Sequence, residues 1–260
     1  MKGKGKVTFQ VLLLGLGLIL AACGGGAGVP TENASVGTYN YGGSSPGISV
    51  IVSAHLKNPT SPEGMRVSVK DPQGNELFSG NREWRIFLAV KRPFYSWRLR
   101  SDLTASQGRY TVSVDPPINR TWQTAVDPTK LLDRPQPQLS ANQTSATISW
   151  APVSGAKAYY VELWQTDDQG SSLIRFVRDW VTNQTSVQFN QLNLSQGNYY
   201  RAWVYAFEAD MVDRYNLPAQ LGKQVNASVR STSAFRVQSL GTLRILDHLP
   251  DDVPPPDMER

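Results

Sequence analysis

The chain has 260 residues, which is long enough for two modules of about 100 residues each. Its net charge of +5 owes much to three lysines in the first 22 residues, a segment without any acid; residues 23–260 carry 23 Lys and Arg against 21 Asp and Glu, a net charge of +2. This small excess does not predict a nucleic-acid partner. The single cysteine, Cys23, excludes an intramolecular disulfide, so the fold must rely on its core.

The first 22 residues have the three parts of an export signal. A cationic start contains Lys2, Lys4 and Lys6, residues 11–20 are apolar, and small residues precede Cys23. The apolar stretch is too short to span a bilayer comfortably. We therefore expect residues 1–22 to be a signal peptide that is removed before Cys23.

The sequence Leu20-Ala21-Ala22-Cys23 resembles the lipobox of bacterial lipoproteins. The resemblance implies that the Cys23 thiol is joined to diacylglycerol and that the new amino terminus is acylated, and two or three acyl chains give stable anchoring. It thus implies a lipid-anchored protein of the cell envelope with the membrane as a partner. Gly24, at the position where some bacteria carry a retention Asp, favours the outer membrane or the cell surface. The alternative is a buried or incidental cysteine.

After Cys23 the chain is expected to be all-β. Residues 23–39 are Gly-rich and polar and predict a flexible tether, whereas short segments such as Ile48–Val52 and Tyr110–Val114 alternate or are β-branched. Prolines interrupt the alternation between two such regions. The expected units are an N-terminal β-sandwich, a linker, a second β-sandwich and a disordered acidic, Pro-rich tail, at residues 40–127, 128–136, 137–246 and 247–260.

The second module resembles a fibronectin type III domain. Thr147–Pro152 looks like strand B with Trp150 in the core, Tyr159–Trp164 looks like strand C, and Leu194, Gly197 and Tyr200 have the family's spacing before strand F. The resemblance implies that Tyr200 has a buried ring and returns its hydroxyl to nearby backbone. Ser106–Tyr110 is similar to Ser195–Tyr199, which favours two tandem immunoglobulin-like or fibronectin type III-like β-sandwiches.

Alternation on the second module's strands predicts a first candidate binding surface. If Tyr200, Ala202, Val204 and Ala206 face inward, their neighbours face outward. The expected outward residues are Tyr160, Glu162 and Trp164 on one strand, and Tyr199, Arg201, Trp203 and Tyr205 on the next. Such a face can stack on sugar rings or receive a protein. Three alternatives remain open: these aromatic pairs only stabilise the sheet, residues 210–229 fold back over them, or the register is shifted by one residue.

A second candidate surface lies in the first module. Residues 82–109 interleave basic and aromatic side chains, with Arg98 and Arg100 among the basic ones. This pattern can hold an anionic envelope glycan or a lipid headgroup. The alternative is a sandwich strand with a solvated cationic face.

Candidate catalytic groups are few. His55 and His248 are the only histidines, so the sequence offers no material for a Ser-His-Asp arrangement or a His-based metal site, and no cofactor is expected. We therefore expect a binding protein without catalytic residues, whose partner is an envelope protein or a glycan. The alternative is an envelope hydrolase or a carbohydrate-binding accessory subunit.

Overall fold

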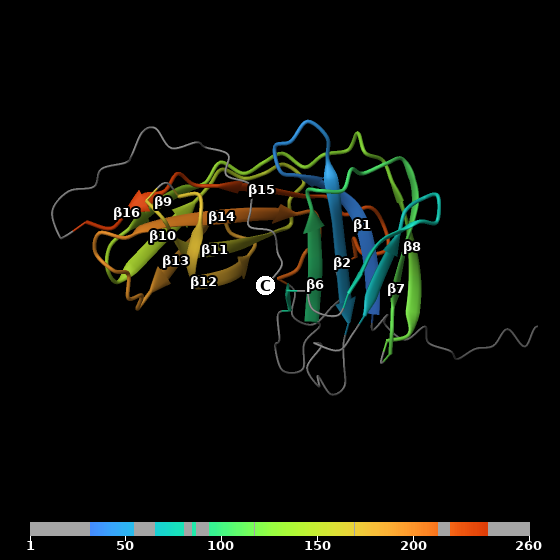
Figure 1. Ribbon diagram of the computed structural model, residues 1–260, viewed down its shortest axis with the longest axis horizontal. Coiled ribbons are helices and arrows are strands. Elements are labelled where there is room, and N and C mark those ends of the chain that lie inside the picture. The colour runs from blue at the N-terminus through green and yellow to red at the C-terminus, as the bar shows by residue number, and fades with distance from the viewer. Residues whose placement is uncertain are drawn as a thin grey trace, which may run out of the picture. The chain divides into compact units, whose positions relative to one another are not determined.

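The computed structural model describes residues 32–54, 66–80, 85–86, 94–116, 118–168, 170–212 and 219–238. These residues form strands, turns and loops without any helix, so among them no helix can cross a membrane. They belong to one compact unit, in which two β-sandwiches lie side by side (Figure 1). The fold class predicted from the sequence is confirmed.

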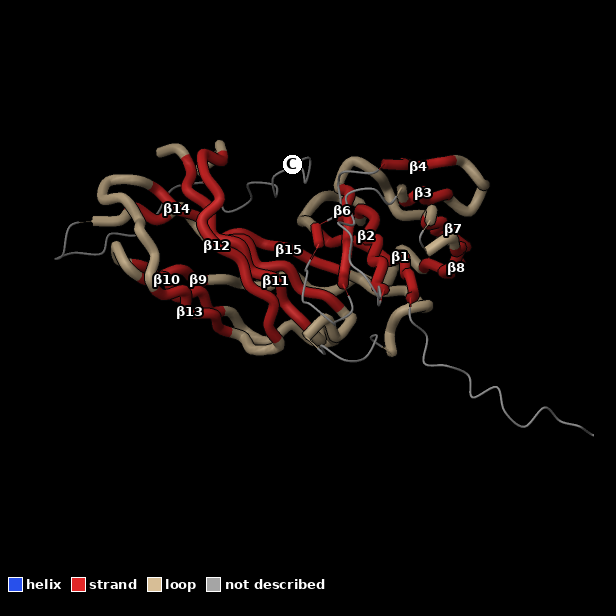
Figure 2. Tube along the Cα trace, turned by 90° about the horizontal axis from the view of Figure 1, so that it is seen from below, coloured by secondary structure: helices blue, strands red, loops and turns tan. Residues whose placement is uncertain are grey.

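The first sandwich contains eight strands in two sheets. The strands are β1 (Glu32–Asn40), β2 (Gly47–Ala54), β3 (Val67–Lys70), β4 (Glu76–Gly80), β5 (Arg85–Ile86), β6 (Phe94–Arg100), β7 (Gly108–Val114) and β8 (Arg120–Val126). One layer has the order β1-β2-β6-β5 and the other β4-β3-β7-β8; Figure 2 shows β1, β2 and β6 of the first layer beside the four strands of the second. When the strands are lettered along the chain as in an immunoglobulin-like domain, β1-β2-β6-β5 corresponds to the sheet order A-B-E-D and β4-β3-β7-β8 to the sheet order C′-C-F-G. Buried valines of β2, β3 and β7 form the core between the layers.

The second sandwich repeats this plan. Its strands are β9 (Gln138–Ala141), β10 (Ser145–Ser149), β11 (Ala158–Thr166), β12 (Leu173–Thr182), β13 (Ser186–Asn190), β14 (Tyr199–Phe207), β15 (Ala227–Ser231) and β16 (Phe235–Arg236). A three-stranded sheet, β13-β10-β9, faces β12-β11-β14, and both β15 and β16 pair with β14. The core between these two sheets includes Trp150, whose ring packs edge to face against Tyr159 with 5.1 Å between the ring centres. The expected core role of Trp150 is thus confirmed.

Both sandwiches contain a tyrosine corner. The Tyr200 hydroxyl accepts a hydrogen bond from the Ser195 amide at 2.8 Å, and the Tyr110 hydroxyl accepts one from the Ser106 amide at 2.8 Å. Both rings are buried. The short sequence repeat therefore marks two equivalent corners, although the structural equivalent of Tyr110 is Tyr200, one residue beyond the Tyr199 that aligns with it.

A single nine-stranded sheet runs through both sandwiches. β15 of the second sandwich pairs in parallel with β1 of the first, with Tyr39 opposite Ala227 and Asn40 opposite Ser228. Gly37 permits this approach, because a Cβ at that position would lie 2.0 Å from the Val225 carbonyl oxygen. The two modules therefore share one sheet and are not independent domains joined only by a linker.

The predicted tether requires correction, whereas the predicted linker lies where it was expected, between β8 and β9. Residues 32–39 of the expected tether lie in β1, and residues 34–39 are buried, because β1 pairs with β2 on one side and with β15 on the other. The expected linker, 128–136, is held along its length: the Lys130 and Leu132 carbonyls accept hydrogen bonds from side chains of β1. The signal peptide, Cys23 and the tail 247–260 lie outside the described residues.

Candidate functional site

The predicted aromatic face lies on the side of β11 and β14 that was expected, but it is buried. Tyr159, Val161, Leu163 and the even-numbered residues Tyr200–Ala206 point into the sandwich core, so the register is confirmed. Tyr160, Trp164, Trp203 and Tyr205 point to the other side, where each is at most 6% exposed. The expectation that these four side chains are available to a partner is wrong.

A second hydrophobic core explains this burial. The connection from β14 to β15 places Met211, Leu221 and Val225 over the aromatic residues. The first sandwich contributes Tyr39, Ile51 and Leu99 from β1, β2 and β6 to the same cluster. Both faces of β11 and β14 are therefore buried, and the alternative in which residues 210–229 cover the aromatic face is confirmed for the described parts of that segment, residues 210–212 and 219–229.

The two charged residues of this face are buried as well. Glu162 is fully buried, and its Oε2 accepts hydrogen bonds from Trp164 Nε1 at 3.2 Å and from the Tyr205 hydroxyl at 3.5 Å. Arg201, also fully buried, donates from Nη1 to Ser231 Oγ at 3.0 Å. Both charged groups therefore lie inside the second core and offer no surface to a ligand.

The remaining predicted residues do not join this cluster. Tyr199 is half-buried with the Arg236 guanidinium 5.6 Å from its ring centre. Arg98, expected on an exposed cationic face, is buried, and its guanidinium lies 4.7 Å from the centre of the Phe78 ring. Arg100 is partly exposed and pairs with Asp102, and this hydrogen bond lowers the pKa of the Asp102 carboxyl. Neither arginine presents an open cationic surface.

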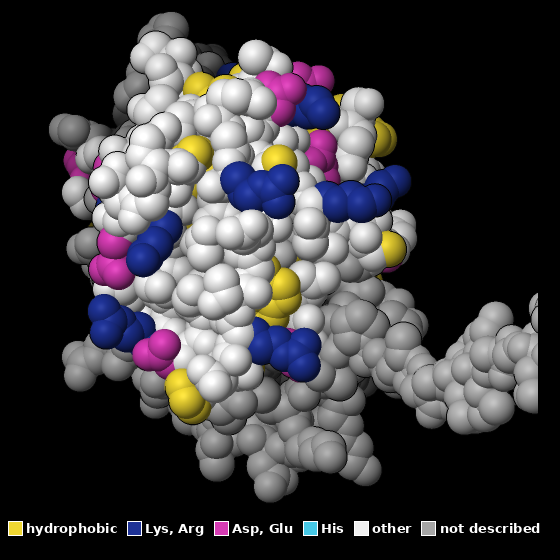
Figure 3. Space-filling view, turned by 90° about the vertical axis from the view of Figure 1, so that its right-hand side faces the viewer, with side chains coloured by type: hydrophobic (Ala, Val, Ile, Leu, Met, Phe, Trp, Pro, Cys, Tyr) yellow, Lys and Arg dark blue, Asp and Glu magenta, His cyan; other side chains and the backbone are white. Residues whose placement is uncertain are grey.

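The basic residues of the first sandwich do not gather elsewhere on the face that Figure 3 shows. On this side of the molecule, where β7 and β8 lie, Lys and Arg side chains are scattered among Asp and Glu. Much of the segment 82–93 lies outside the described residues. The described part therefore offers no continuous cationic patch on this face.

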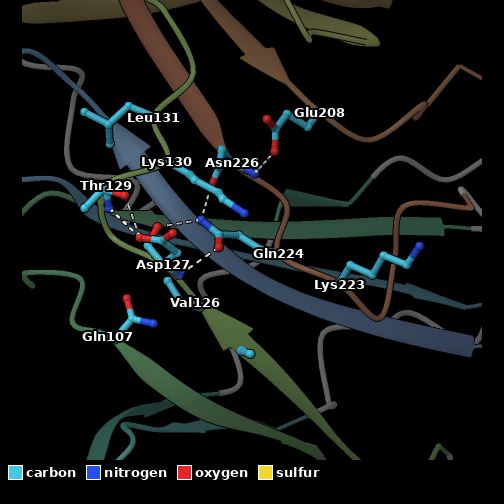
Figure 4. Close-up of a pocket in the computed structure, with 11 residues that line it drawn as sticks. Gln107, Val126, Asp127, Thr129, Lys130, Leu131, Glu208, Lys223, Gln224 and Asn226 are labelled. Atoms are coloured by element: carbon cyan, nitrogen blue, oxygen red, sulfur yellow. Dashed lines mark hydrogen bonds between the residues drawn. The ribbon is translucent and has the colours of Figure 1, made fainter.

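An open hollow of about 700 Å³ lies at the junction of the sandwiches, lined by Gln107, the end of β8, residues 127 and 129–131, Glu208, Lys223, Gln224 and Asn226. The Asp127 backbone amide donates to Gln224 Oε1 at 2.8 Å, and Gln224 Nε2 donates to the Asp127 carbonyl at 2.9 Å (Figure 4). The Asn226 amide donates to Glu208 Oε2 at 2.8 Å. Hydrogen bonds from Thr129 lower the pKa of the Asp127 carboxyl. The carboxylates of Asp127 and Glu208 thus accept hydrogen bonds from the Thr129 and Asn226 amides and fix local backbone, and we assign the hollow a structural role.

The most exposed apolar surface is on β12. Of the large hydrophobic side chains that are exposed among the described residues, Ile174, Phe176 and Trp180 lie on this one strand, and Leu131 lies elsewhere. Trp180 is 53% exposed, and two exposed arginines, Arg175 and Arg178, lie on the same strand. Aromatic and arginine side chains are the types most often found at binding hot spots. β12 is therefore the candidate functional site.

The edge of β12 is unsuited to backbone pairing. β12 is the last strand of the nine-stranded sheet, and its register with β11 shifts twice, between Leu163 and Trp164 and between Gln165 and Thr166. Such bulges, with charged residues, protect an edge strand against pairing with another strand. The edge of β12 is therefore not arranged for the addition of a further strand.

Sequence reasoning did not single out β12. The available signal was Leu173–Thr182, in which apolar and aromatic residues alternate with Arg175, Arg178 and Asp179. By contrast, β14 has eight apolar or aromatic residues, three of them tyrosines, in nine positions. A nearly continuous apolar run is typical of a strand buried on both faces.

No group of three or more His, Cys, Asp or Glu side chains in the described part of the chain is arranged to hold a metal ion. His55 and His248 lie outside that part.

Comparisons with known proteins concern the fold. No family model matches the chain, and no curated protein matches its sequence. Among solved structures, the fibronectin type III domain of human collagen α1(XX) aligns with 17% identity over 45% of this chain and 94% of that chain, with a TM-score of 0.30. A two-domain fibronectin type III segment of chicken tenascin aligns with 15% identity over 68% of this chain and 85% of that chain, with a TM-score of 0.25. At these TM-scores the alignments carry no argument about function; the immunoglobulin-like assignment stands on the strand orders and cores described above.

Proposed function

We propose that this protein is a lipid-anchored component of a bacterial cell envelope, at the outer membrane or cell surface, that displays β12 to a protein or glycan partner. The observation that carries the proposal is the concentration of exposed large apolar side chains on β12. Monomeric proteins seldom gather such residues on one element without a use for them. Cys23, through the lipobox resemblance, supports the anchor.

The junction between the sandwiches suits a display role. The shared sheet and the second core join the two modules, so β12 is presented in a fixed orientation relative to β1. Eight residues lie between Cys23 and Glu32, the first residue of β1, and the nine steps from Cα to Cα span at most about 30 Å. In the anchored protein the start of β1 therefore stays within about 30 Å of the lipid attachment point.

The anchor is tested by Cys23→Ser. We expect the variant to lose labelling by a palmitate analogue and to leave the detergent phase, because the thioether cannot form. A variant that labels and partitions like the wild type would show that the lipoprotein assignment is wrong.

Display by β12 is tested by site-specific photocrosslinking in cells of the source organism. Trp180→p-benzoylphenylalanine is expected to give a discrete adduct, because that side chain is half exposed. The matched control is Gln123→p-benzoylphenylalanine, which places the same group on an exposed position of β8. Adducts at neither position, or equal adducts at both, would contradict display by β12.

A further inference from the structure

We propose that the face of β12 carrying Arg175, Arg178 and Trp180 binds an anionic polysaccharide, with a sugar ring stacked on Trp180 and acidic groups paired with the two guanidinium groups. This inference rests on the proposed function, since it names the ligand class of the same surface.

The strand register places the three side chains on one face. Trp180 lies opposite Val161, Arg178 opposite Leu163 and Arg175 opposite Gln165. Val161 and Leu163 point toward the core of the second sandwich, and residues opposite one another in an antiparallel pair share a face. Trp180, Arg178 and Arg175 therefore form a line along β12, with about 7 Å between the first two.

Phe176 and Asp179 of β12 lie on the opposite face from this line. Phe176 lies opposite Trp164 and packs edge-on against its ring at 5.2 Å, on the face of the second core. Asp179 lies opposite Glu162 on that same face, and its Oδ2 accepts a hydrogen bond from the Tyr160 hydroxyl at 2.9 Å. The line thus contains one aromatic residue and two cations, without an acid from β12.

The chemistry of the line fits an anionic sugar polymer. A guanidinium group matches the two oxygens of a carboxylate or phosphate, and an exposed indole offers a flat apolar surface to the C–H face of a sugar ring. Arg175 is steadied by a hydrogen bond from its Nε to Gln165 Oε1 at 3.4 Å. Two cations on one face require complementary negative charge in the ligand.

The width of the site favours a polysaccharide over a folded protein. A stable protein interface needs about 800 Å² on each partner, from 20 to 30 residues, whereas the exposed line is one strand wide. The two bulges also oppose the addition of a partner's strand to the edge. A single extended polymer needs only a line of contacts.

The experiment titrates the chain from Cys23 to Arg260, lipidated and in detergent micelles, with galacturonate oligosaccharides, and follows tryptophan fluorescence and heat. We expect saturable binding that weakens as salt rises, because screening reduces charge attraction. Trp180→Ala should lower the affinity by at least about tenfold. Arg178→Glu should lower it similarly and reduce the salt dependence.

Matched variants separate side-chain chemistry from general effects. Trp180→Phe preserves an aromatic ring and should retain affinity within about threefold. Arg178→Lys keeps the charge but loses the paired hydrogen bonds of the guanidinium group, so its affinity should lie between those of the wild type and Arg178→Glu. Leu131→Ala and Arg109→Glu remove an exposed apolar and an exposed basic side chain elsewhere, and should leave the affinity unchanged.

The outcomes distinguish this inference from the proposed function. Failure of galacturonate oligosaccharides to bind, or equal binding by the Ala and Glu variants, overturns a carboxylated glycan. Parallel titrations use dextran as a neutral polymer, a phosphate-containing wall polymer and polyglutamate. If the phosphate polymer binds and Trp180→Ala weakens that binding, the ligand is an anionic glycan whose acidic group is phosphate. If only polyglutamate binds, the ligand is an acidic protein instead of a glycan, and the proposed display of β12 to a partner still holds. If the photocrosslink at position 180 is also absent, the proposed function fails too.

Discussion

Gly37→Ala should weaken the junction between the two sandwiches. A Cβ at position 37 would lie 2.0 Å from the Val225 carbonyl oxygen and 2.4 Å from its carbon, so β1 and residues 222–226 must move apart. Forcing extra volume into a packed site costs about 1–3 kcal/mol. The same movement stretches the hydrogen bond from the Thr38 amide to Asn226 Oδ1, 3.0 Å long and buried, and an unsatisfied buried donor costs a further 1–3 kcal/mol or so.

The expected loss in the free energy of unfolding is therefore about 2–6 kcal/mol. For a folded unit of this size, each kcal/mol lowers Tm by roughly 2–4 °C. Urea and thermal unfolding measure the loss, and amide hydrogen exchange locates it: the amides of Thr38 and Val225 should exchange faster, whereas those of β10 should not change. The control is Gly74→Ala, at a turn glycine with φ +89° and open space around its Cβ position, which costs only the left-handed backbone, about 1–2 kcal/mol. If Gly37→Ala costs no more than Gly74→Ala, the close approach does not limit the junction.

Two further predictions concern the sandwiches themselves. Tyr110→Phe and Tyr200→Phe should each lower the free energy of unfolding by about 1–3 kcal/mol, because the Ser106 and Ser195 amides lose their acceptors. Urea unfolding of both variants measures this loss. A loss at only one of the two tyrosine corners would show that they are not equivalent. The isolated fragment 137–246 should bind a hydrophobic dye and self-associate, because it lacks the Tyr39, Ile51 and Leu99 side chains that cover its aromatic face. A monomeric fragment that binds no dye would show that residues 208–229 suffice to cover that face.

The sequence pattern of β11 and β14 predicted which side chains share a face, but it did not predict that the outer face is buried. Alternation identified which side chains of β11 and β14 share a face, because the direction of a side chain on a strand depends only on its immediate backbone. Burial of the outer face depends on segments far away in the chain: Val225 and Leu221 follow β14 by more than ten residues, and Tyr39 precedes it by more than 150. No pattern within β14 states which distant segment will cover it, although its apolar composition indicates that something does.

The sequence predicted the parallel pairing of β1 with β15 even less well than it predicted the burial of the outer face of β14. Residues 32–40 read Glu-Asn-Ala-Ser-Val-Gly-Thr-Tyr-Asn, a small and polar composition that resembles a tether when judged by hydrophobicity alone. In the structure the same small residues are what the position requires: Gly37 admits the Val225 backbone, and Ser49 of the adjacent β2 donates to the Val225 carbonyl at 2.7 Å. A central strand crowded by backbone on its outer face selects small hydrogen-bonding residues rather than large apolar ones. Composition therefore misplaces the boundary of the tether by eight residues, for the same reason that Gly37 is a sensitive point of the junction.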